Sequence, residues 1–122
     1  VVPVDSRAVR RYLKSKGTAR GEDSMYARVT TLQFKPGRSE EGIGIFDQSV
    51  LPAAKAQKGY RGAYFLADRE AARCIAVTFW ESAADAAANE ENRYYQEQLV
   101  KFMALYSAPP VREGYDVAVE HH

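Results

Sequence analysis

Residue types that perform covalent or metal chemistry are scarce in this sequence. The 122 residues include two histidines, His121 and His122, at the very end, and one cysteine, Cys74, which stands among apolar neighbours. Neither a Ser/His/Asp set nor a Cys/His pair can be assembled from them in the body of the chain. The single cysteine also excludes an internal disulfide and a cysteine-based zinc cluster. GxGxxG and phosphate-loop motifs are lacking, so we expect no metal and no cofactor.

Aromatic side chains are the remaining candidates for chemistry. Trp80 offers a broad ring for stacking and one N–H donor, a combination that suits an aromatic ligand. The chain has eight tyrosines, and the hydroxyls of Tyr64, Tyr94 and Tyr95 can orient a polar substrate or move a proton. Adjacent helix positions diverge by about 100°, which predicts that one of Tyr94 and Tyr95 lies at the rim of a pocket or at the surface. The alternative for all these rings is that they only fill the core.

Charge is unevenly placed along the chain. Residues 1–24 carry a net charge of +3, which leaves −2 for the remainder out of a total of +1. A slightly acidic body without a basic face argues against nucleic acid as a partner. Arg28 and Arg73, in predicted strands, can either neutralise an anionic ligand or pair with acidic residues across the sheet, and we expect pairing.

Composition indicates one ordinary globular domain. A chain of 122 residues, 46% hydrophobic and 27% charged, is large enough for a single core. No apolar run approaches the ~18 residues needed to cross a bilayer, and the first residues lack an apolar signal core. We therefore expect no membrane partner and a cytoplasmic location. We divide the chain into a basic arm at 1–24, either natural or a leader or vector remnant, a domain at 25–120, and a tag remnant at 121–122.

The first half of the domain predicts a strand and a helix. Residues 25–35 are rich in β-branched and aromatic side chains and end at a Pro-Gly pair, which is typical of a strand followed by a turn. Apolar residues then recur at helical spacing up to Ala54, and Ser39 supplies a capping oxygen. Two glycines weaken this helix, and Pro52 predicts a kink or an early stop near its end.

The second half of the domain predicts a hairpin, a helical region and a last strand. Residues 60–67 and 73–81 are β-rich runs joined by a short polar connection. Ser82 begins a capping-box-like pattern that leads into one helix or two, because residues 89–92 are polar and poor helix formers. Residues 115–120 alternate as a last strand. The order βαββαβ predicts a ferredoxin-like α+β fold, a four-stranded antiparallel sheet with helices on one face.

The third predicted strand is apolar on both faces. Cys74, Thr78 and Trp80 alternate with Val77 and Phe79, so neither side of this strand is conventionally polar. Two helices can cover only one face of a sheet, and a second copy of the domain is the simplest cover for the other. We therefore expect a homodimer that pairs through the sheet faces into a dimeric α+β barrel.

Several short motifs carry a family resemblance. They are, in order, Lys35-Pro36-Gly37, Lys58-Gly59-Tyr60-Arg61-Gly62, Thr78-Phe79-Trp80-Glu81-Ser82 and the tyrosine-rich second helical region. Over residues 25–120 the chain resembles the antibiotic biosynthesis monooxygenase family of the dimeric α+β barrel superfamily. The resemblance implies that Trp80 looks into a pocket between sheet and helices, where such a residue helps to seat a flat phenolic or quinone-type substrate. The candidate substrate-binding residues are Trp80, Thr78, Tyr95, Tyr94, Tyr64, Phe46 and Arg28.

Two functions of different classes fit this pocket. The first is a cofactor-independent monooxygenase, in which an aromatic substrate is deprotonated and then reduces oxygen. The second is a non-catalytic module that binds or senses a small organic molecule. Haem degradation, known in the same superfamily, relies there on a histidine of the second helix and an asparagine of the first strand. Residues 82–106 contain no histidine and residues 25–35 no asparagine, so we do not expect haem.

Overall fold

The structure, a computed structural model, describes residues 24–122. The predicted arm, Ser24 excepted, lies outside the described residues, and the proposed domain boundaries stay predictions. The described chain follows the predicted order of strands and helices. Its elements are β1 Tyr26–Gln33, α3 Ser39–Ile45, the π-helical turn η1 Phe46–Val50, α4 Leu51–Lys55, β2 Tyr60–Asp68, β3 Arg73–Trp80, α5 Ala83–Glu91, α6 Tyr94–Val100, the 3-10 turn η2 Met103–Leu105 and β4 Val111–Asp116.

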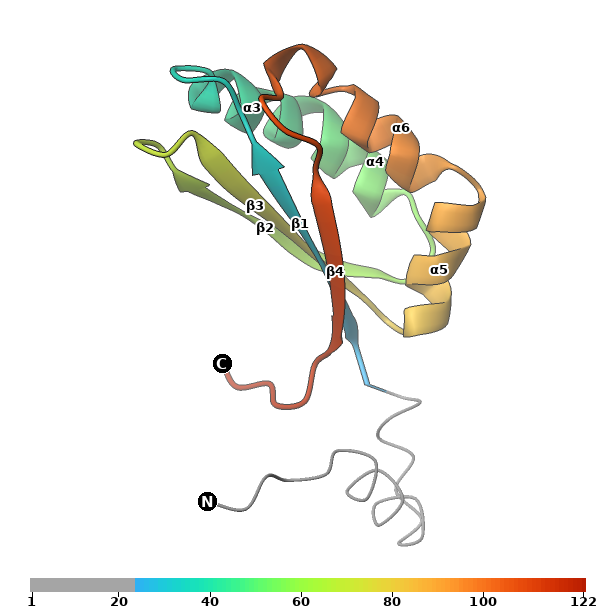
Figure 1. Cartoon of the computed structure of the whole chain (residues 1–122). Helices are drawn as coiled ribbons and strands as arrows, with labels where there is room; N and C mark the ends of the chain where they lie inside the picture. The colour runs from blue at the N-terminus through green and yellow to red at the C-terminus, as the bar shows by residue number, and fades with distance from the viewer. Residues whose placement is uncertain (1–23) are drawn as a thin grey trace, which may run out of the picture.

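The strands form one antiparallel sheet in the order β2-β3-β1-β4 (Figure 1). Arg28 of β1 lies opposite Thr78 of β3. On the other side of β1, Thr30 lies opposite Arg112 of β4. The predicted hairpin is formed by β2 and β3. The predicted ferredoxin-like α+β fold is confirmed, and its central strand β1 has neighbours on both sides that can contribute to a site.

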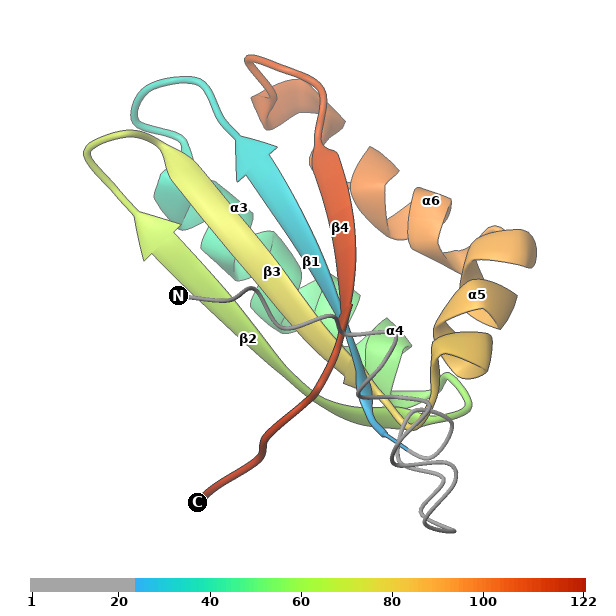
Figure 2. The same ribbon diagram turned by 60° about the horizontal axis from the view of Figure 1, so that its bottom comes forward.

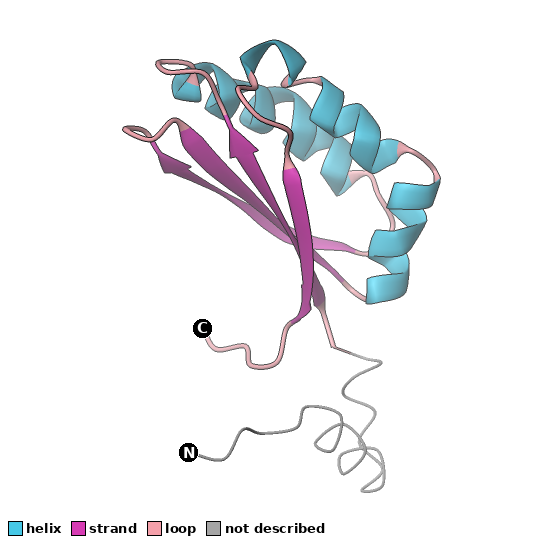
Figure 3. Cartoon of the chain, viewed as in Figure 1, coloured by secondary structure: helices cyan, strands magenta, loops and turns pink. Residues whose placement is uncertain are grey.

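The helices of the described chain lie against one face of the sheet, as two views and the colouring by element show (Figures 1, 2 and 3). On β3, Cys74, Thr78 and Trp80 are buried beneath them. Val77 and Phe79 point to the opposite face and are half-buried. The predicted alternation of this strand is confirmed. Among residues 24–122, no helix is long and apolar enough to cross a membrane.

Two clusters of buried side chains fill the space between the sheet and the helices. The smaller cluster contains Trp80 with Ala54, Ala86, Tyr94 and Tyr95. Fully burying a large apolar side chain stabilises a fold by about 1.5–3 kcal/mol, so this cluster fixes α5 and α6 on the sheet. The larger cluster comprises Leu32, Phe34, Phe46, Val50, Ala72, Cys74, Phe102 and Leu105.

The first helical segment is continuous but not uniform. α3 passes into the π-helical turn η1, and α4 begins beside Pro52. Proline has no N–H to donate to the preceding turn, and the wider π-helical turn ends two residues before Pro52. The predicted early stop is wrong, because α4 continues to Lys55. The two glycines of α3 differ in the space around them. A Cβ added to Gly42 would collide with the Phe34 ring, whereas a Cβ added to Gly44 would have no neighbouring atom within 4 Å. Gly42 thus allows the close approach of α3 to the sheet.

Of the two helix caps predicted at serines, one is confirmed and the other is wrong. Ser82 caps α5 as predicted, since its hydroxyl accepts from the Asp85 N–H at 3.1 Å. The predicted cap at Ser39 is wrong, because the N-cap of α3 is Arg38. The helix begins one residue early, and the Ser39 hydroxyl, now inside the first turn, is buried with no hydrogen-bonding partner in the described chain. From that position it cannot satisfy the free amides of the helix end.

The last strand lies earlier than predicted. β4 spans Val111–Asp116 instead of 115–120, because its partner β1 begins at Tyr26, which faces Asp116. One further hydrogen bond, from the Val117 N–H to the Met25 carbonyl at 2.8 Å, ends the pairing. The apolar alternation beyond it continues past the end of β1. The boundary therefore depends on the partner strand rather than on the residues of β4.

Candidate functional site

A cavity of about 40 Å³ lies between the centre of the sheet and α6, with room for a few water molecules. Its walls combine apolar rings with a few polar groups, as in small-molecule pockets. In the described part of the chain, no three histidine, cysteine, aspartate or glutamate side chains are grouped so as to hold a metal ion. The lining residues that bear on its chemistry are Arg28, Thr30, Phe46, Thr78, Tyr94, Tyr95 and Gln98.

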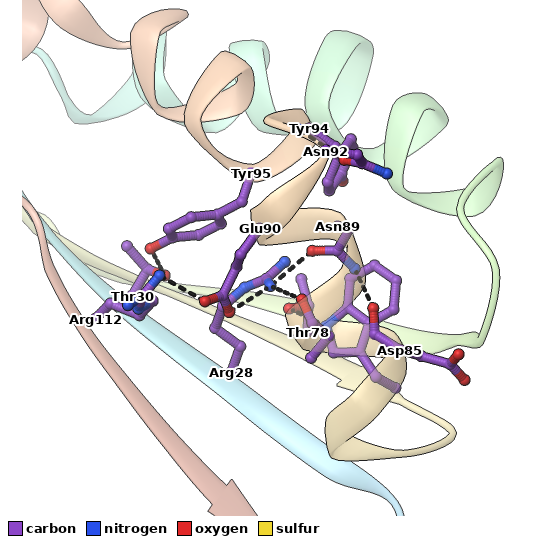
Figure 4. Close-up of polar contacts among 12 residues, drawn as sticks. Arg28, Thr30, Thr78, Asp85, Asn89, Glu90, Asn92, Tyr94, Tyr95 and Arg112 are labelled. Carbon is purple, nitrogen blue, oxygen red and sulfur yellow. Dashed lines mark hydrogen bonds and ion pairs between the residues drawn. The ribbon is translucent and has the colours of Figure 1, made fainter.

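Arg28 is the charged wall of this cavity, although it is only 3% exposed. Its Nη1 donates to Asn89 Oδ1 at 2.8 Å, to Glu90 Oε2 at 3.1 Å and to the Ala86 carbonyl at 3.4 Å. All three partners belong to α5, so the side chain ties β1 to that helix (Figure 4). Burial lowers the pKa of Arg28 and the bond to Glu90 opposes this shift. The guanidinium keeps its charge at neutral pH.

Glu90 links Arg28 to the edge strand β4. Its other oxygen, Oε1, accepts from Arg112 Nη1 at 2.7 Å. The guanidinium of Arg112 also lies 5.5 Å from the centre of the Tyr95 ring. Two guanidinium groups therefore share one carboxylate, but Arg112 is half-exposed and solvent screens its charge. The charge that bears on a ligand in the cavity is the buried one of Arg28.

Two aromatic rings enclose the guanidinium of Arg28. Its carbon lies 4.3 Å from the centre of the Tyr95 ring and 5.2 Å from that of Trp80, within the range of cation–π attraction. Trp80 is fully buried, and its indole N–H donates to the Thr78 hydroxyl at 2.9 Å. Tyr94 packs edge-on against Trp80, with ring centres 6.4 Å apart. The rings and the charge hold one another in place.

Tyr94 and Tyr95 both line the cavity, each 8% exposed. The prediction that one of them lies at the rim or surface is wrong. α6 is covered on two sides, because the Tyr95 hydroxyl is hydrogen-bonded to that of Thr30 on β1 at 2.8 Å, while Tyr94 packs in the cluster that contains Ala54 of α4. Burial raises the pKa of Tyr94 to about 12, and it also raises the pKa of Tyr95. Both phenols therefore stay protonated at neutral pH.

The break between α5 and α6 positions these tyrosines. Arg93 adopts a left-handed backbone with φ 72°, and the side-chain oxygen of Asn92 accepts from the Tyr94 N–H at 3.0 Å. Asparagine forms such local bonds readily. The predicted alternative of two consecutive helices is confirmed, and the break lies at Asn92 and Arg93, at the end of the polar segment 89–92.

The predicted site residues divide by position. Arg28, Phe46, Thr78, Tyr94 and Tyr95 line the cavity, and Trp80 is buried directly behind Thr78. Tyr64 lies on the opposite face of the sheet, where it is 63% exposed and edge-on to the Phe79 ring. The geometry brings the first six together and leaves Tyr64 apart, and their role in substrate binding stays a prediction.

Sequence reasoning missed several polar residues of the site. The segment 89–92 signals a helix break, and nothing in it reveals that Asn89 and Glu90 face Arg28. Arg28 pairs with an acid, as expected, but with one on α5 instead of one across the sheet. Gln98 follows Tyr94 by four positions and Tyr95 by three, so helical spacing could have placed it on the same wall. Arg112 precedes the predicted last strand, so no signal marked it.

This fold and this cavity define a ferredoxin-like domain with a ring-lined, positively charged pocket between sheet and helices. The family model described as "Antibiotic biosynthesis monooxygenase" matches residues 25–98. The chain belongs to the antibiotic biosynthesis monooxygenase family, and the resemblance noted in its motifs is confirmed.

Curated relatives come from Mycobacterium tuberculosis (strain ATCC 25618 / H37Rv). The uncharacterized protein Rv2557 is 31% identical over 98 residues, which cover 80% of this chain and 42% of that protein. The uncharacterized protein Rv2558 is 38% identical over 58 residues, 48% of this chain and 25% of that protein. The chain thus spans less than half the length of these relatives.

Solved structures share the fold. The NE2512 protein of unknown function from Nitrosomonas europaea superposes with a TM-score of 0.65 at 22% identity, covering 84% of this chain and 97% of that one. The ActVA-Orf6 monooxygenase from Streptomyces coelicolor, solved in complex with nanaomycin D, gives a TM-score of 0.67 at 13% identity, covering 82% and 93%. At these identities the likeness establishes the fold alone.

Proposed function

We propose that this domain binds a small aromatic molecule in the cavity beside Arg28 and oxidises it with dioxygen, without a metal or an organic cofactor. The observation that carries the proposal is the buried guanidinium of Arg28, enclosed by the rings of Tyr95 and Trp80 at the wall of the cavity. An aromatic anion in the cavity meets a positive charge and ring-lined walls together. Membership in the antibiotic biosynthesis monooxygenase family supports the same class of reaction.

The proposed reaction converts a phenol and one dioxygen into a quinone and one water. The phenol loses a proton, and the resulting anion, stabilised by Arg28, transfers electrons to dioxygen. A carbon–oxygen bond forms at the ring carbon that loses its hydrogen, and the second oxygen atom leaves as water, so the ring gives four electrons and dioxygen takes four. Tyr94 and Tyr95 keep their protons because burial raises the pKa of both. They act as hydrogen-bonding groups, and the substrate proton passes to water.

Part of the cavity wall must move to admit a ring. The cavity measures about 40 Å³, whereas an engineered core cavity that binds benzene measures about 150 Å³. Phe46 and Val50 of the π-helical turn η1 line the cavity, and such turns are frequent at functional sites. We expect η1 to be the wall that shifts when a ligand enters.

A non-catalytic ligand-binding or sensing role is the second candidate function. It is favoured by the absence, among the described residues that line the cavity, of a side chain that acts as a base at neutral pH. Arg28 is protonated, and both tyrosines stay neutral because burial raises the pKa of each. The same rings and the same charge then hold a small organic molecule without reaction.

Oxygen uptake with a panel of anthrone-type and hydroquinone-type substrates tests the monooxygenase proposal. We expect consumption above background for at least one member, and a rate roughly 10- to 100-fold lower for Trp80→Phe and Tyr95→Phe, because small misplacements of positioning groups have effects of this size. Tyr115→Phe, the same phenol-to-phenyl change on the opposite face, is the matched control and should keep the rate. If no member of the panel consumes oxygen, the monooxygenase proposal fails and only binding remains.

We also propose that two copies pair through the open faces of their sheets, in a reducing compartment such as the cytoplasm. Tyr64, Leu66, Val111 and Tyr115 are all more than half exposed on that face. An apolar face of this kind is rarely left uncovered, and a twofold pairing of identical faces covers it in both copies. Sedimentation velocity at micromolar concentration should give a dimer. A stable monomer under these conditions contradicts the proposal.

A further inference from the structure

Arg28 has hydrogen-bond donors that the protein does not use. A guanidinium carries five N–H groups, and Nη1 alone makes the bonds that tie Arg28 to α5. Nε and Nη2 make no hydrogen bond to another described residue. Arg28 is buried and lines the cavity, so a ligand that enters the cavity can accept from these donors.

Gln98, in contrast, has a hydrogen-bond acceptor that the protein does not use. Its Oε1 is buried and has no hydrogen-bonding partner in the described chain, and the residue is 7% exposed and lines the cavity. The amide nitrogen donates to the Tyr94 carbonyl at 3.3 Å, which fixes which end of the amide is the oxygen. A buried acceptor without a donor is unfavourable, so a ligand that widens the cavity and donates to this oxygen would remove that cost.

Two pairs of polar groups in and beside the cavity wall are hydrogen-bonded, whereas the hydroxyl of Tyr94 has no hydrogen bond to another described residue. The hydroxyls of Thr30 and Tyr95 are hydrogen-bonded to each other, and the Thr78 hydroxyl accepts from Trp80. The charged donor without a full set of partners is Arg28, and the buried acceptor without a partner is Oε1 of Gln98. A complementary ligand offers an ionised oxygen to the first and an O–H or N–H to the second.

The size of the cavity limits the rest of the ligand. Every aromatic ligand requires the 40 Å³ cavity to widen, since benzene occupies about 150 Å³ in an engineered core. A single ring requires the least widening, and each fused ring requires more. The cavity is therefore better suited to one ring than to three.

Building on the proposed binding function of this cavity, we propose that its ligand is a single-ring hydroxylated aromatic acid. The carboxylate accepts hydrogen bonds from Nε and Nη2 of Arg28, and the ring hydroxyl donates to Oε1 of Gln98. The three isomers of hydroxybenzoate are the simplest molecules of this class, and the isomer that binds most tightly reports the separation of the two protein groups.

Fluorescence of Trp80 measures this binding directly. It is the only tryptophan of the chain, and its hydrogen bond to Thr78 places it behind the cavity wall. Under anaerobic conditions we expect one hydroxybenzoate isomer to bind about tenfold more tightly than benzoate, which lacks the donor. The same isomer should bind at least tenfold more tightly than the matching hydroxybenzyl alcohol, which lacks the charge, and more tightly than anthracene carboxylate.

Two variants separate the two recognition groups. Gln98→Met removes the unpaired oxygen with little change of shape, and it should reduce hydroxybenzoate affinity to that of benzoate while benzoate affinity stays unchanged. Arg28→Met should lower the affinity for both acids at least tenfold and leave the alcohols unaffected. Arg73→Met is the matched control, since Arg73 pairs with Asp68 at the exposed end of the hairpin. If Arg28→Met does not fold, Gln98→Met by itself decides the outcome.

Equal affinities for hydroxybenzoate, benzoate and the alcohol overturn this inference, and so does tighter binding of the three-ring acid. Because binding is measured without oxygen, the result is independent of the oxygen-uptake experiment. Hydroxybenzoate binding without oxygen consumption supports this inference and contradicts the monooxygenase proposal. Oxygen consumption with a three-ring phenol and no hydroxybenzoate binding contradicts this inference and supports the monooxygenase proposal.

Discussion

The two faces of the sheet carry similar aromatic residues in opposite environments. On the face covered by helices, Trp80 and Tyr95 are buried, and their polar atoms are hydrogen-bonded to Thr78 of β3 and Thr30 of β1. On the open face, Tyr64 and Tyr115 remain 63% and 51% exposed. The two pairs of residues are of similar type. They differ in exposure because α5 and α6 cover one face of the sheet and no helix covers the other. An aromatic stripe on a strand therefore marks a candidate pocket only where another layer encloses it.

Charge follows the same division. Arg28 is buried among helix groups on the covered face, whereas on the open face the Tyr115 hydroxyl donates to Glu113 in an exposed position at 2.7 Å. Solvent screens the exposed pair, so its contribution to stability is small. The buried guanidinium acts on its surroundings in a low dielectric. A charged ligand would therefore interact more strongly with the covered face than with the open face.

The largest expected difference between the faces comes from neighbouring positions on β3. Trp80→Ala should lower the free energy of unfolding by about 3–5 kcal/mol, because it leaves a cavity beneath the helices. Phe79→Ala, one residue earlier and on the open face, should cost about 1 kcal/mol in the monomer, since the Phe79 ring is only half-buried. Urea unfolding at a protein concentration that keeps the chain monomeric measures both. Equal losses for the two variants contradict the comparison.

Alkaline pH should lower the free energy of unfolding through Tyr94, which is buried on the covered face. Burial raises the pKa of Tyr94 from 10.0 to about 12. Below pH 10 the folded and unfolded states both hold the proton, so stability does not depend on this group. Between pH 10 and 12 only the unfolded state ionises, and the free energy of unfolding falls by about 3 kcal/mol. Urea unfolding from pH 9 to 12 should show a smaller fall for Tyr94→Phe, and parallel curves for the two proteins contradict the prediction.

The two glycines of α3 sharpen the comparison within one helix. Gly42→Ala should lower the free energy of unfolding by about 1–3 kcal/mol, because the new methyl group meets the buried Phe34 ring. Gly44→Ala has open space around it and should raise stability by about 0.5–1 kcal/mol through the better helix propensity of alanine. Thermal unfolding monitored by circular dichroism measures both shifts. Shifts of the same sign contradict the prediction.

A charge on the open face should have the smallest effect on the monomer. Leu66 is 52% exposed, so Leu66→Asp should change the free energy of unfolding of the monomer by no more than about 0.5 kcal/mol. The same substitution should abolish the proposed dimer, because a carboxylate buried without a partner is strongly unfavourable. Denaturant unfolding measures the first effect and sedimentation velocity the second. A dimer that survives Leu66→Asp places the interface elsewhere.

Much of the fold could be predicted because its signals are local. Apolar periodicity, the Pro-Gly turn and the polar hairpin connection specify elements within a few residues of one another, and the order βαββαβ follows from them. The errors occur where one segment depends on another. The end of β4 is set by the first residue of β1. The N-cap of α3 is Arg38 instead of the predicted Ser39.

The sequence by itself determined the order of the elements and the two-sided apolar third strand, because both follow from the spacing of residue types along the chain. Its short motifs also carried the resemblance to the family. Only the tertiary structure decided what the site contains. Arg28 meets Asn89 across 61 positions of sequence, Tyr94 and Tyr95 are buried together because α6 is covered on two sides, and the Gln98 oxygen remains unpaired in the wall of the cavity. These contacts depend on how β1 packs against α5 and α6. That packing joins residues far apart in the sequence, so no local pattern predicts it.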